Sequence, residues 1–255
     1  YSPPIVKSIG TNIMNITEVN PADKLILTPN IISFDKKLSY LWQTINTSLT
    51  LQYDSNVATK LENNQLVIKA HVFGYFEQYT FRITVTNSDG GSGIGHLKIQ
   101  TGRPPWGGSF YVNPINGTTL STHFNFRTEN WTDDASSFPL SYTFTYAREG
   151  TWTTLASQSP TRNTTKILPM GYGDDFLIGV GVKVTDVWGL SASTNKTIQV
   201  FGLPDDEIAG AVSAFADAAS AAIEGGDFDA ASSYIAASSS VISGFLTSSS
   251  NSSDD

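Results

Sequence analysis

Short segments of alternating apolar and polar residues recur through the first half of the chain. Four of them are KLSYLWQT (37–44), QLVIKAHV (65–72), YTFRITVTN (79–87) and GHLKIQT (95–101). Alternation with a period of two is typical of strands that bury one face. Between them, DSN, ENN and SDGGSG supply the Asn, Asp and Gly residues that suit positive-φ turn positions. The pattern predicts a β-sandwich.

The second half of the chain repeats this plan. LSYLW (38–42) returns as LSYTF (140–144), YTFRITVTNSDGGSG (79–93) as FLIGVGVKVTDVWGLSA (176–192), and LKIQT (97–101) as KTIQV (196–200). A spacing of about 100 residues indicates tandem domains rather than a solenoid. We therefore expect a mainly β protein with two tandem sandwiches of the immunoglobulin or fibronectin-III type, residues 1–102 and 103–203. Trp42 and Tyr79 occupy positions where such sandwiches place a core tryptophan and a corner tyrosine.

The composition changes after Leu203 to alanine, serine and a helical apolar period. Pro204 and three acidic residues suit a helix start, and Gly225–Gly226 suit a left-handed stop. A helical hairpin is predicted over 204–246, and its small side chains predict that it needs another surface for stability. The Ser-rich residues 247–255 are predicted to be a disordered linker. The apolar positions expected to pack are Ile208, Val212, Phe215, Ala219, Ile223, Phe228, Tyr234, Ile235, Val241, Ile242 and Phe245.

Charge and hydropathy exclude two classes of function. A formal net charge of -8 and an isoelectric point near 4.8 oppose binding to nucleic-acid phosphates. No apolar run is long enough to span a bilayer. The chain begins at Tyr1 without an initiator methionine or a signal sequence, so we expect an ectodomain or a processed fragment of a larger protein.

Acceptor sequons for N-linked glycans occur about twice as often as this composition would give at random. Surface glycosylation in a secretory compartment is the expected reason. The absence of cysteine points the other way, although sandwiches of about 100 residues fold without disulfides. The predicted glycosylation sites are Asn15, Asn46, Asn116, Asn130, Asn163, Asn195 and Asn251.

No residue pattern assigns catalytic roles, and no enzyme activity is predicted. His71, His96 and His123 lie in separate segments without metal-ligand spacing, and thiol catalysis is excluded. The Gly-rich pieces GGSGIG (90–95) and GYGDD (171–175) do not match a nucleotide loop and are interpreted as turns. No cofactor is expected apart from glycans. A hydrolase on a β scaffold is the weakest hypothesis.

Two further sets of residues raise binding questions. The acidic residues could hold calcium, which rigidifies some extracellular domain junctions, but they form no calcium loop, and solvated turns are the preferred interpretation. Four tryptophans could form a sugar-stacking face, although core packing is favoured. These residues are Asp133, Asp134, Asp174, Asp175, Asp186, Asp205 and Asp206, and Trp106, Trp131, Trp152 and Trp188.

The stretch GGSFYVNPINGTTLSTHF, followed by NWTDDASSFPLSYTF, resembles the REJ (receptor for egg jelly) module of the polycystin family. The matches are strongest over 104–146, the D-x-W-G at Asp186, Trp188 and Gly189 extends them, and Tyr79–Ser88 resembles the preceding sandwich of that module. The matching residues are Pro104, Gly107, Gly108, Pro114, Gly117, Leu120, Thr122, Phe124, Trp131, Asp133, Pro139, Leu140, Tyr142 and Phe144.

The resemblance carries two further implications. Family members commonly have cysteines at positions that correspond to Phe110 and Thr128, so here apolar burial would replace the covalent link. In relatives, a helical stretch after the module leads toward an autoproteolysis-inducing domain and membrane helices. The chain contains no His-Leu-Ser/Thr cleavage motif, so any cleavage would lie beyond Asp255.

The favoured hypothesis is a non-enzymatic extracellular segment of a polycystin-like surface glycoprotein on a cell, cilium or flagellum. It would act as a stalk, adhesion or assembly module whose partners are other extracellular chains, copies of itself or a polycystin-type channel. The alternative is a carbohydrate-binding module of a secreted or surface glycan-processing protein, in which the tryptophans line an exposed platform.

Overall fold

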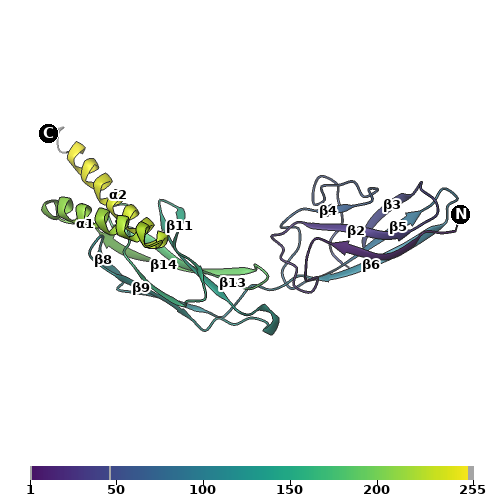
Figure 1. Ribbon diagram of the computed structural model, residues 1–255, viewed down its shortest axis with the longest axis horizontal. Helices are drawn as coiled ribbons and strands as arrows, with labels where there is room; N and C mark the ends of the chain where they lie inside the picture. Colours follow the sequence, from purple (N-terminus) through teal and green to yellow (C-terminus); the bar gives the residue numbers. More distant parts are fainter. Residues whose placement is uncertain (1, 46, 252–255) are drawn as a thin grey trace. The chain divides into compact units, whose positions relative to one another are not determined.

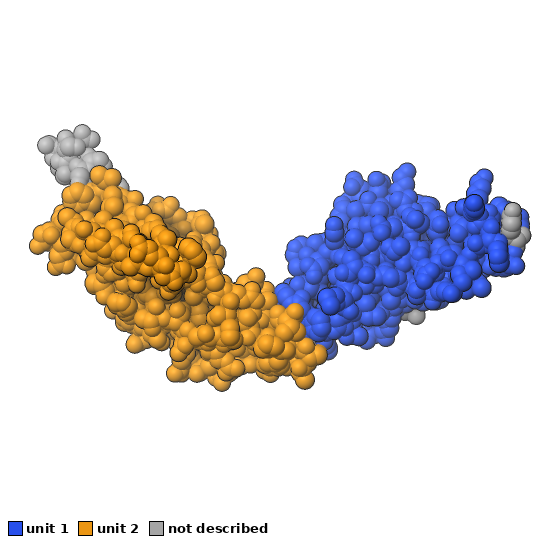
Figure 2. Space-filling view, viewed as in Figure 1, with its two compact units in different colours: residues 1–104, 188–190 blue, residues 105–187, 191–255 orange. Residues whose placement is uncertain are grey.

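The computed structural model describes residues 2–45 and 47–251, with side chains to Leu246 (Figure 1). The chain forms two compact units (Figure 2). The first contains residues 1–104 and 188–190, and the second contains residues 105–187 and 191–255.

The first unit is a sandwich of two antiparallel three-stranded sheets. The predicted strands at 37–44, 79–87 and 95–101 are confirmed as β3 (Ser39–Ile45), β5 (Gln78–Thr86) and β6 (Ser92–Gln100). The predicted strand at 65–72 is too long, because β4 ends at Ile68 and His71 has a φ of 62°. One sheet has the order β1 (Ile5–Thr11), β2 (Leu25–Ile32), β4 (Leu66–Ile68), and the other has the order β3 (Ser39–Ile45), β5 (Gln78–Thr86), β6 (Ser92–Gln100).

Trp42 and Tyr79 both belong to the core of this sandwich, as their positions predicted. Trp42 is fully buried, and its indole N–H donates to the Asn63 carbonyl at 3.0 Å. The Tyr79 hydroxyl accepts a hydrogen bond from the Gly74 N–H at 2.9 Å, which is the tyrosine corner of this fold class. The hydroxyl also donates to Glu77, and burial together with this carboxylate raises the pKa of Tyr79.

The Gly-rich piece 90–95 differs from its prediction as a turn. Gly90 is in the turn, with a φ of 83°, but residues from Ser92 onward belong to β6. A Cβ at Gly93 would overlap the Pro4 carbonyl, and one at Gly95 would overlap Val6. These glycines therefore allow the first strand to lie close against β6. In the other piece, Gly173 has a φ of 73° and begins a turn over residues 173–176, close to the predicted 171–175.

The second unit contains a five-stranded sheet opposite a three-stranded sheet. Its central order β10-β13-β14 matches β3-β5-β6, so the sequence repeat is a structural repeat. A short 3-10 helix (Ala135–Ser137) precedes β10. The larger sheet has the order β11 (Thr151–Ser159), β10 (Ser141–Arg148), β13 (Leu177–Thr185), β14 (Ser191–Phe201), β8 (Asn116–Thr118), and the smaller has the order β12 (Asn163–Lys166), β9 (Phe124–Glu129), β7 (Ser109–Asn113).

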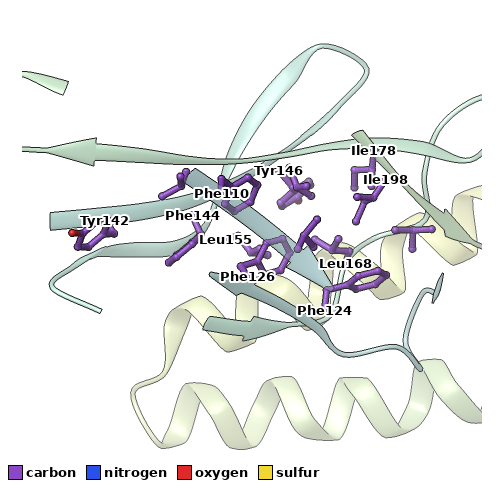
Figure 3. Packing of buried hydrophobic residues seen from close by; sticks show 14 of the residues in the cluster. Phe110, Phe124, Phe126, Tyr142, Phe144, Tyr146, Leu155, Leu168, Ile178 and Ile198 are labelled. Carbon is purple, nitrogen blue, oxygen red and sulfur yellow. The ribbon is translucent and has the colours of Figure 1, made fainter. Parts of the chain in front are cut away.

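Aromatic side chains from both sheets fill the core of the second unit (Figure 3). Phe110 and Phe126 stack at 6.3 Å between ring centroids, and Phe144 from the opposite sheet lies 6.2 Å from Phe126. Each such ring removes a large apolar area from water. The sandwich therefore has an interior that needs no covalent link.

Two helices complete the second unit, α1 (Asp205–Glu224) and α2 (Phe228–Asn251). Gly226, with a φ of 78°, reverses the chain between them as predicted. Ile208, Val212, Phe215 and Tyr234 pack together, and buried Ala237 and Val241 join Leu120 and Ile167 of the sandwich. The hairpin thus uses the sandwich as its second surface.

Two details of the helical prediction were wrong. Ile223, Phe228, Ile235 and Ile242 are 43–69% exposed and Phe245 is 41% exposed, so these side chains are only partly covered. Helix α2 also continues to Asn251, so the predicted linker begins as helix. None of the described helices is long and apolar enough to cross a membrane.

Candidate functional site

A half-exposed tryptophan marks the outer face of the larger sheet in the second unit. Trp152 lies on the edge strand β11 and is 50% exposed. It pairs with Ala147 of β10, which in turn pairs with Gly179 of β13. Neighbouring Val180 points into the core, so alternation directs Gly179 and its row outward.

Two glycines make room for the Trp152 ring. A Cβ at Gly181 would lie 3.3 Å from the indole Cζ3, and one at Gly179 would lie 3.5 Å from Cη2. The indole therefore extends from β11 across β10 to β13. The sequence reads GVGV at this point, so the two valines fill the core while the two glycines leave the outer face open.

Beyond the ring is a groove of about 280 Å³ that Asn195 also borders. Asn195 of β14 pairs with Gly181, and its Cβ lies 3.3 Å from where a Gly181 Cβ would be. Thr145, Lys183 and Ser193 supply polar atoms along the walls. The groove thus combines an aromatic ring, hydrogen-bonding groups and a predicted glycosylation site.

Of the other candidate tryptophans, Trp106 and Trp188 are half-buried, and Trp131 does not extend this face. Trp131 is half-buried, follows β9 of the opposite sheet and packs against the core. Its indole N–H donates to the Thr128 hydroxyl at 2.6 Å. Trp152 and Trp131 therefore belong to different sheets and do not form one stacking face, and the favoured core packing holds for Trp131.

The predicted glycosylation sites that the structure describes lie on loops and strands. Asn116, Asn130, Asn163 and Asn195 are exposed, and Asn15 is half-buried. The Asn15 side-chain oxygen accepts hydrogen bonds from the Thr17 N–H and hydroxyl. Asn46 and the side chain of Asn251 lie outside the described residues. Glycosylation itself stays a prediction.

The candidate metal-binding residues are dispersed. His71, His96 and His123 are exposed on separate segments. Asp133 and Asp186 are buried, whereas Asp174, Asp175, Asp205 and Asp206 are exposed and Asp134 is half-buried. Within the described ranges, no three His, Asp or Glu side chains gather as a metal site would require. Calcium binding stays a prediction.

The motif residues of the second sandwich have structural positions. Leu140, Tyr142 and Phe144 belong to the core. Gly107 has a φ of 75°, and a Cβ at Gly108 would overlap the Trp131 ring. The Trp131 ring can therefore take its place only because residue 108 is a glycine.

The positions of the expected cysteines are directly opposite each other. Phe110 of β7 pairs with Thr128 of β9 in register. Phe110 is 3% exposed within the aromatic core, and the Thr128 hydroxyl donates to the Ser109 carbonyl at 2.8 Å while accepting from Trp131. Apolar burial and a chain of hydrogen bonds therefore link β7 to β9 at this pair.

Sequence reasoning missed the polar residues that attach α2 to the sandwich. Asp229 accepts from the N–H and the hydroxyl of Ser157 on β11, each at 2.7 Å. Burial raises the pKa of Asp229, but these two bonds and Lys166 outweigh it, so the pKa is lowered overall. Ser240 is buried and accepts from the Met170 N–H at 2.9 Å. Serine is so frequent in this region that the sequence alone does not distinguish Ser240 from its neighbours.

The comparison with known protein families identifies the family of this chain. The REJ domain family model matches residues 2–237, which span both sandwiches and most of the hairpin. The chain therefore belongs to the REJ domain family. No curated protein matches the chain.

Several solved structures of tandem domains are similar to the chain. The N-terminal eight Ig domains of Down Syndrome Cell Adhesion Molecule are 14% identical, with a TM-score of 0.40 over 79% of this chain and 24% of theirs. Three domains of the bacteriophage RB49 Hoc protein are 15% identical, with a TM-score of 0.34 over 77% and 59%. The chicken CNTN1 FN1-FN3 domains are 12% identical, with a TM-score of 0.34 over 78% and 69%. The chain spans about a quarter of the first structure's length.

Proposed function

We propose that this chain is an extracellular structural and interaction segment of a polycystin-like surface glycoprotein. It acts as a stalk, adhesion or assembly module on a cell, ciliary or flagellar surface, beside a polycystin channel or within a fibre. The observation that carries the proposal is the REJ family match over residues 2–237. Tandem sandwiches with packed interiors suit a spacer, because their cores keep each domain rigid while the outer faces remain free to vary.

An apolar strip on α2 supports an interaction role. Phe228, Ile235 and Ile242 recur every seven residues on one side of the helix and are 69%, 52% and 43% exposed. A surface of this kind is stabilised when a partner covers it. The hairpin carries acidic residues and neither Lys nor Arg, and the chain has a net charge of -8. Repulsion between copies therefore favours a different extracellular chain that offers an apolar strip flanked by basic groups.

Intact-mass measurement tests the extracellular assignment. Protein from its native source is weighed before and after enzymatic removal of N-linked glycans. We expect a mass loss, because sequons in a secreted chain are modified during synthesis. A chain of unchanged mass would contradict the assignment.

The interaction role is tested with Ile235→Ser/Ile242→Ser in the full-length native protein. After chemical cross-linking, we expect the double variant to lose partners that the unaltered protein retains, and binding to weaken with salt. Ile94→Ser is the matched control, because Ile94 is 53% exposed on β6 of the first unit. Equal recovery of partners by both variants would contradict the role of α2.

A carbohydrate-binding module is the second candidate, and the exposed Trp152 is the observation that favours it. It predicts glycan-array binding by the secreted chain that is lost in Trp152→Ala while the fold is retained. An array without binding removes this candidate and leaves the structural role untouched.

A further inference from the structure

The groove beside Trp152 contains its own candidate occupant. Asn195, Lys196 and Thr197 form an acceptor sequon on β14. Asn195 is exposed and borders the groove, so a sugar attached to its amide nitrogen would start within the groove itself.

The surface next to Asn195 suits one face of a pyranose ring. The apolar CH face of N-acetylglucosamine matches an indole ring, and hydroxyl and acetamide groups need hydrogen-bonding partners. Trp152 supplies the ring, and Thr145 and Lys183 lie on the same walls. A groove of about 280 Å³ is smaller than most ligand pockets, which corresponds to a single sugar rather than an oligosaccharide.

The glycines explain why the sugar and the ring can meet. Gly181 lies between Trp152 and Asn195. A Cβ at this position would lie 3.3 Å from the Trp152 Cζ3 and 3.3 Å from the Asn195 Cβ. Any larger residue there would separate them. The register then brings Trp152, Gly179 and Thr197 into one outward row, and Gly181 and Asn195 into the next.

We propose that the first N-acetylglucosamine of a glycan on Asn195 packs against Trp152 and covers this face of the sheet. The inference rests on the proposed extracellular function, since N-linked sugars are added in the secretory pathway. The contact shields a half-exposed indole and links the edge strand β11 to β14 across the sheet. The other described sequons serve as internal comparisons for occupancy.

The test uses the full chain secreted from a eukaryotic host, with glycans trimmed to a single N-acetylglucosamine. Four proteins are compared: unaltered, Trp152→Ala, Thr197→Val and the double variant. Thr197→Val removes the sequon but keeps Asn195 and the side-chain shape, and Thr197→Ser is the control that keeps the sequon. Peptide mapping establishes whether Asn195 carries sugar.

We expect Trp152→Ala to lower the Tm of the second unit by about 2–4 °C more with the sequon than without it. Equal losses in both backgrounds would overturn the proposal, as would an unmodified Asn195 in a chain that carries sugar at Asn116 or Asn163. Binding of free glycans by the Thr197→Val protein, lost with Trp152→Ala, would also overturn it in favour of an external ligand.

A second measurement applies if Trp152→Ala is not secreted. In the unaltered chain carrying ¹³C-labelled N-acetylglucosamine, stacking on the indole should move sugar resonances upfield relative to those at Asn116. Identical shifts at the two sites would overturn the proposal. The host secretes the chain whatever its native location. A negative result here therefore concerns only the contact between the sugar and Trp152, whereas a negative mass test on native protein concerns the extracellular assignment.

Discussion

At the residue scale, single side chains hold loops in place through several hydrogen bonds each. Asp35 is 8% exposed; one carboxylate oxygen accepts from the N–H and hydroxyl of Ser88, at 2.8 and 2.6 Å, and the other from the Lys37 N–H at 2.8 Å. The hydroxyl of Ser88, its N–H and the Lys37 N–H together lower the pKa of Asp35 to about 2. All three bonds favour the charged form.

Acid should therefore weaken the first sandwich through Asp35. A carboxyl with a lowered pKa contributes stability that is present above the unfolded-state pKa and is lost as pH falls through the folded-state value. That window runs from about pH 4 to about pH 2. Calorimetry of Asp35→Asn should show a smaller loss of Tm over this window than the unaltered chain. Asp23→Asn, at an exposed position, is the control, and identical pH profiles for Asp35→Asn and the unaltered chain would contradict the assignment.

The tyrosine corner gives a second residue-scale prediction. Tyr79→Phe keeps the buried ring but leaves the Gly74 N–H without its acceptor. We expect a loss of about 0.5–1.5 kcal/mol of unfolding free energy. Peptide-resolved hydrogen exchange over residues 72–86 measures it, with Tyr53→Phe, at a 55% exposed position, as the control. Unchanged exchange in Tyr79→Phe would show that the corner contributes nothing.

At the element scale, helix α2 is attached to the sandwich through both apolar and polar contacts. Ala237 and Val241 are buried against it, and Asp229 and Ser240 bond to Ser157 and to the Met170 N–H. Small residues allow this close approach, but each removes little apolar area. The polar contacts therefore add to the attachment that the apolar side chains provide.

Ser240→Ala should loosen this attachment. The substitution keeps the helix propensity high but removes the acceptor of the half-buried Met170 N–H, which costs about 0.5–1.5 kcal/mol. Faster hydrogen exchange in α2, with the core strands unchanged, is the expected result. Ser239→Ala changes an exposed neighbour and should have no effect. If both variants exchanged alike, the Ser240 bond would not hold the helix.

The sequence predicted the central strands of both sandwiches, because one-sided burial leaves a visible period of two. β5 shows it fully, with Tyr79, Phe81, Ile83 and Val85 buried in turn. The helix faces were predicted less well, because alanine and serine are compatible with either burial or exposure, and the apolar Ile235 and Ile242 lie outward. The groove could not be predicted, because it joins residues of β11, β13 and β14 through their register alone.

At the scale of the whole molecule, the chain has no cysteine, and two buried residues occupy the positions where the resemblance to the REJ module implies a pair of cysteines. The two positions, Phe110 and Thr128, are paired across β7 and β9. Directly opposed residues of antiparallel strands have Cα atoms about 4.5–5.5 Å apart, within the range that a disulfide spans. The backbone register here is therefore compatible with a covalent link.

The double variant Phe110→Cys/Thr128→Cys should form a disulfide, and its stability should depend on that disulfide. Loss of the phenyl ring costs about 3–5 kcal/mol, and loss of the Thr128 bonds adds to this. A disulfide closing a loop of this size returns about 3 kcal/mol. We therefore expect the oxidised variant to be somewhat less stable than the unaltered chain, and reduction to lower its Tm by a further 6–12 °C or so. The unaltered chain, which has no thiols, should be insensitive to reductant. A folded double variant whose thiols stayed free under oxidising conditions would show that the backbone at these two positions does not allow a disulfide.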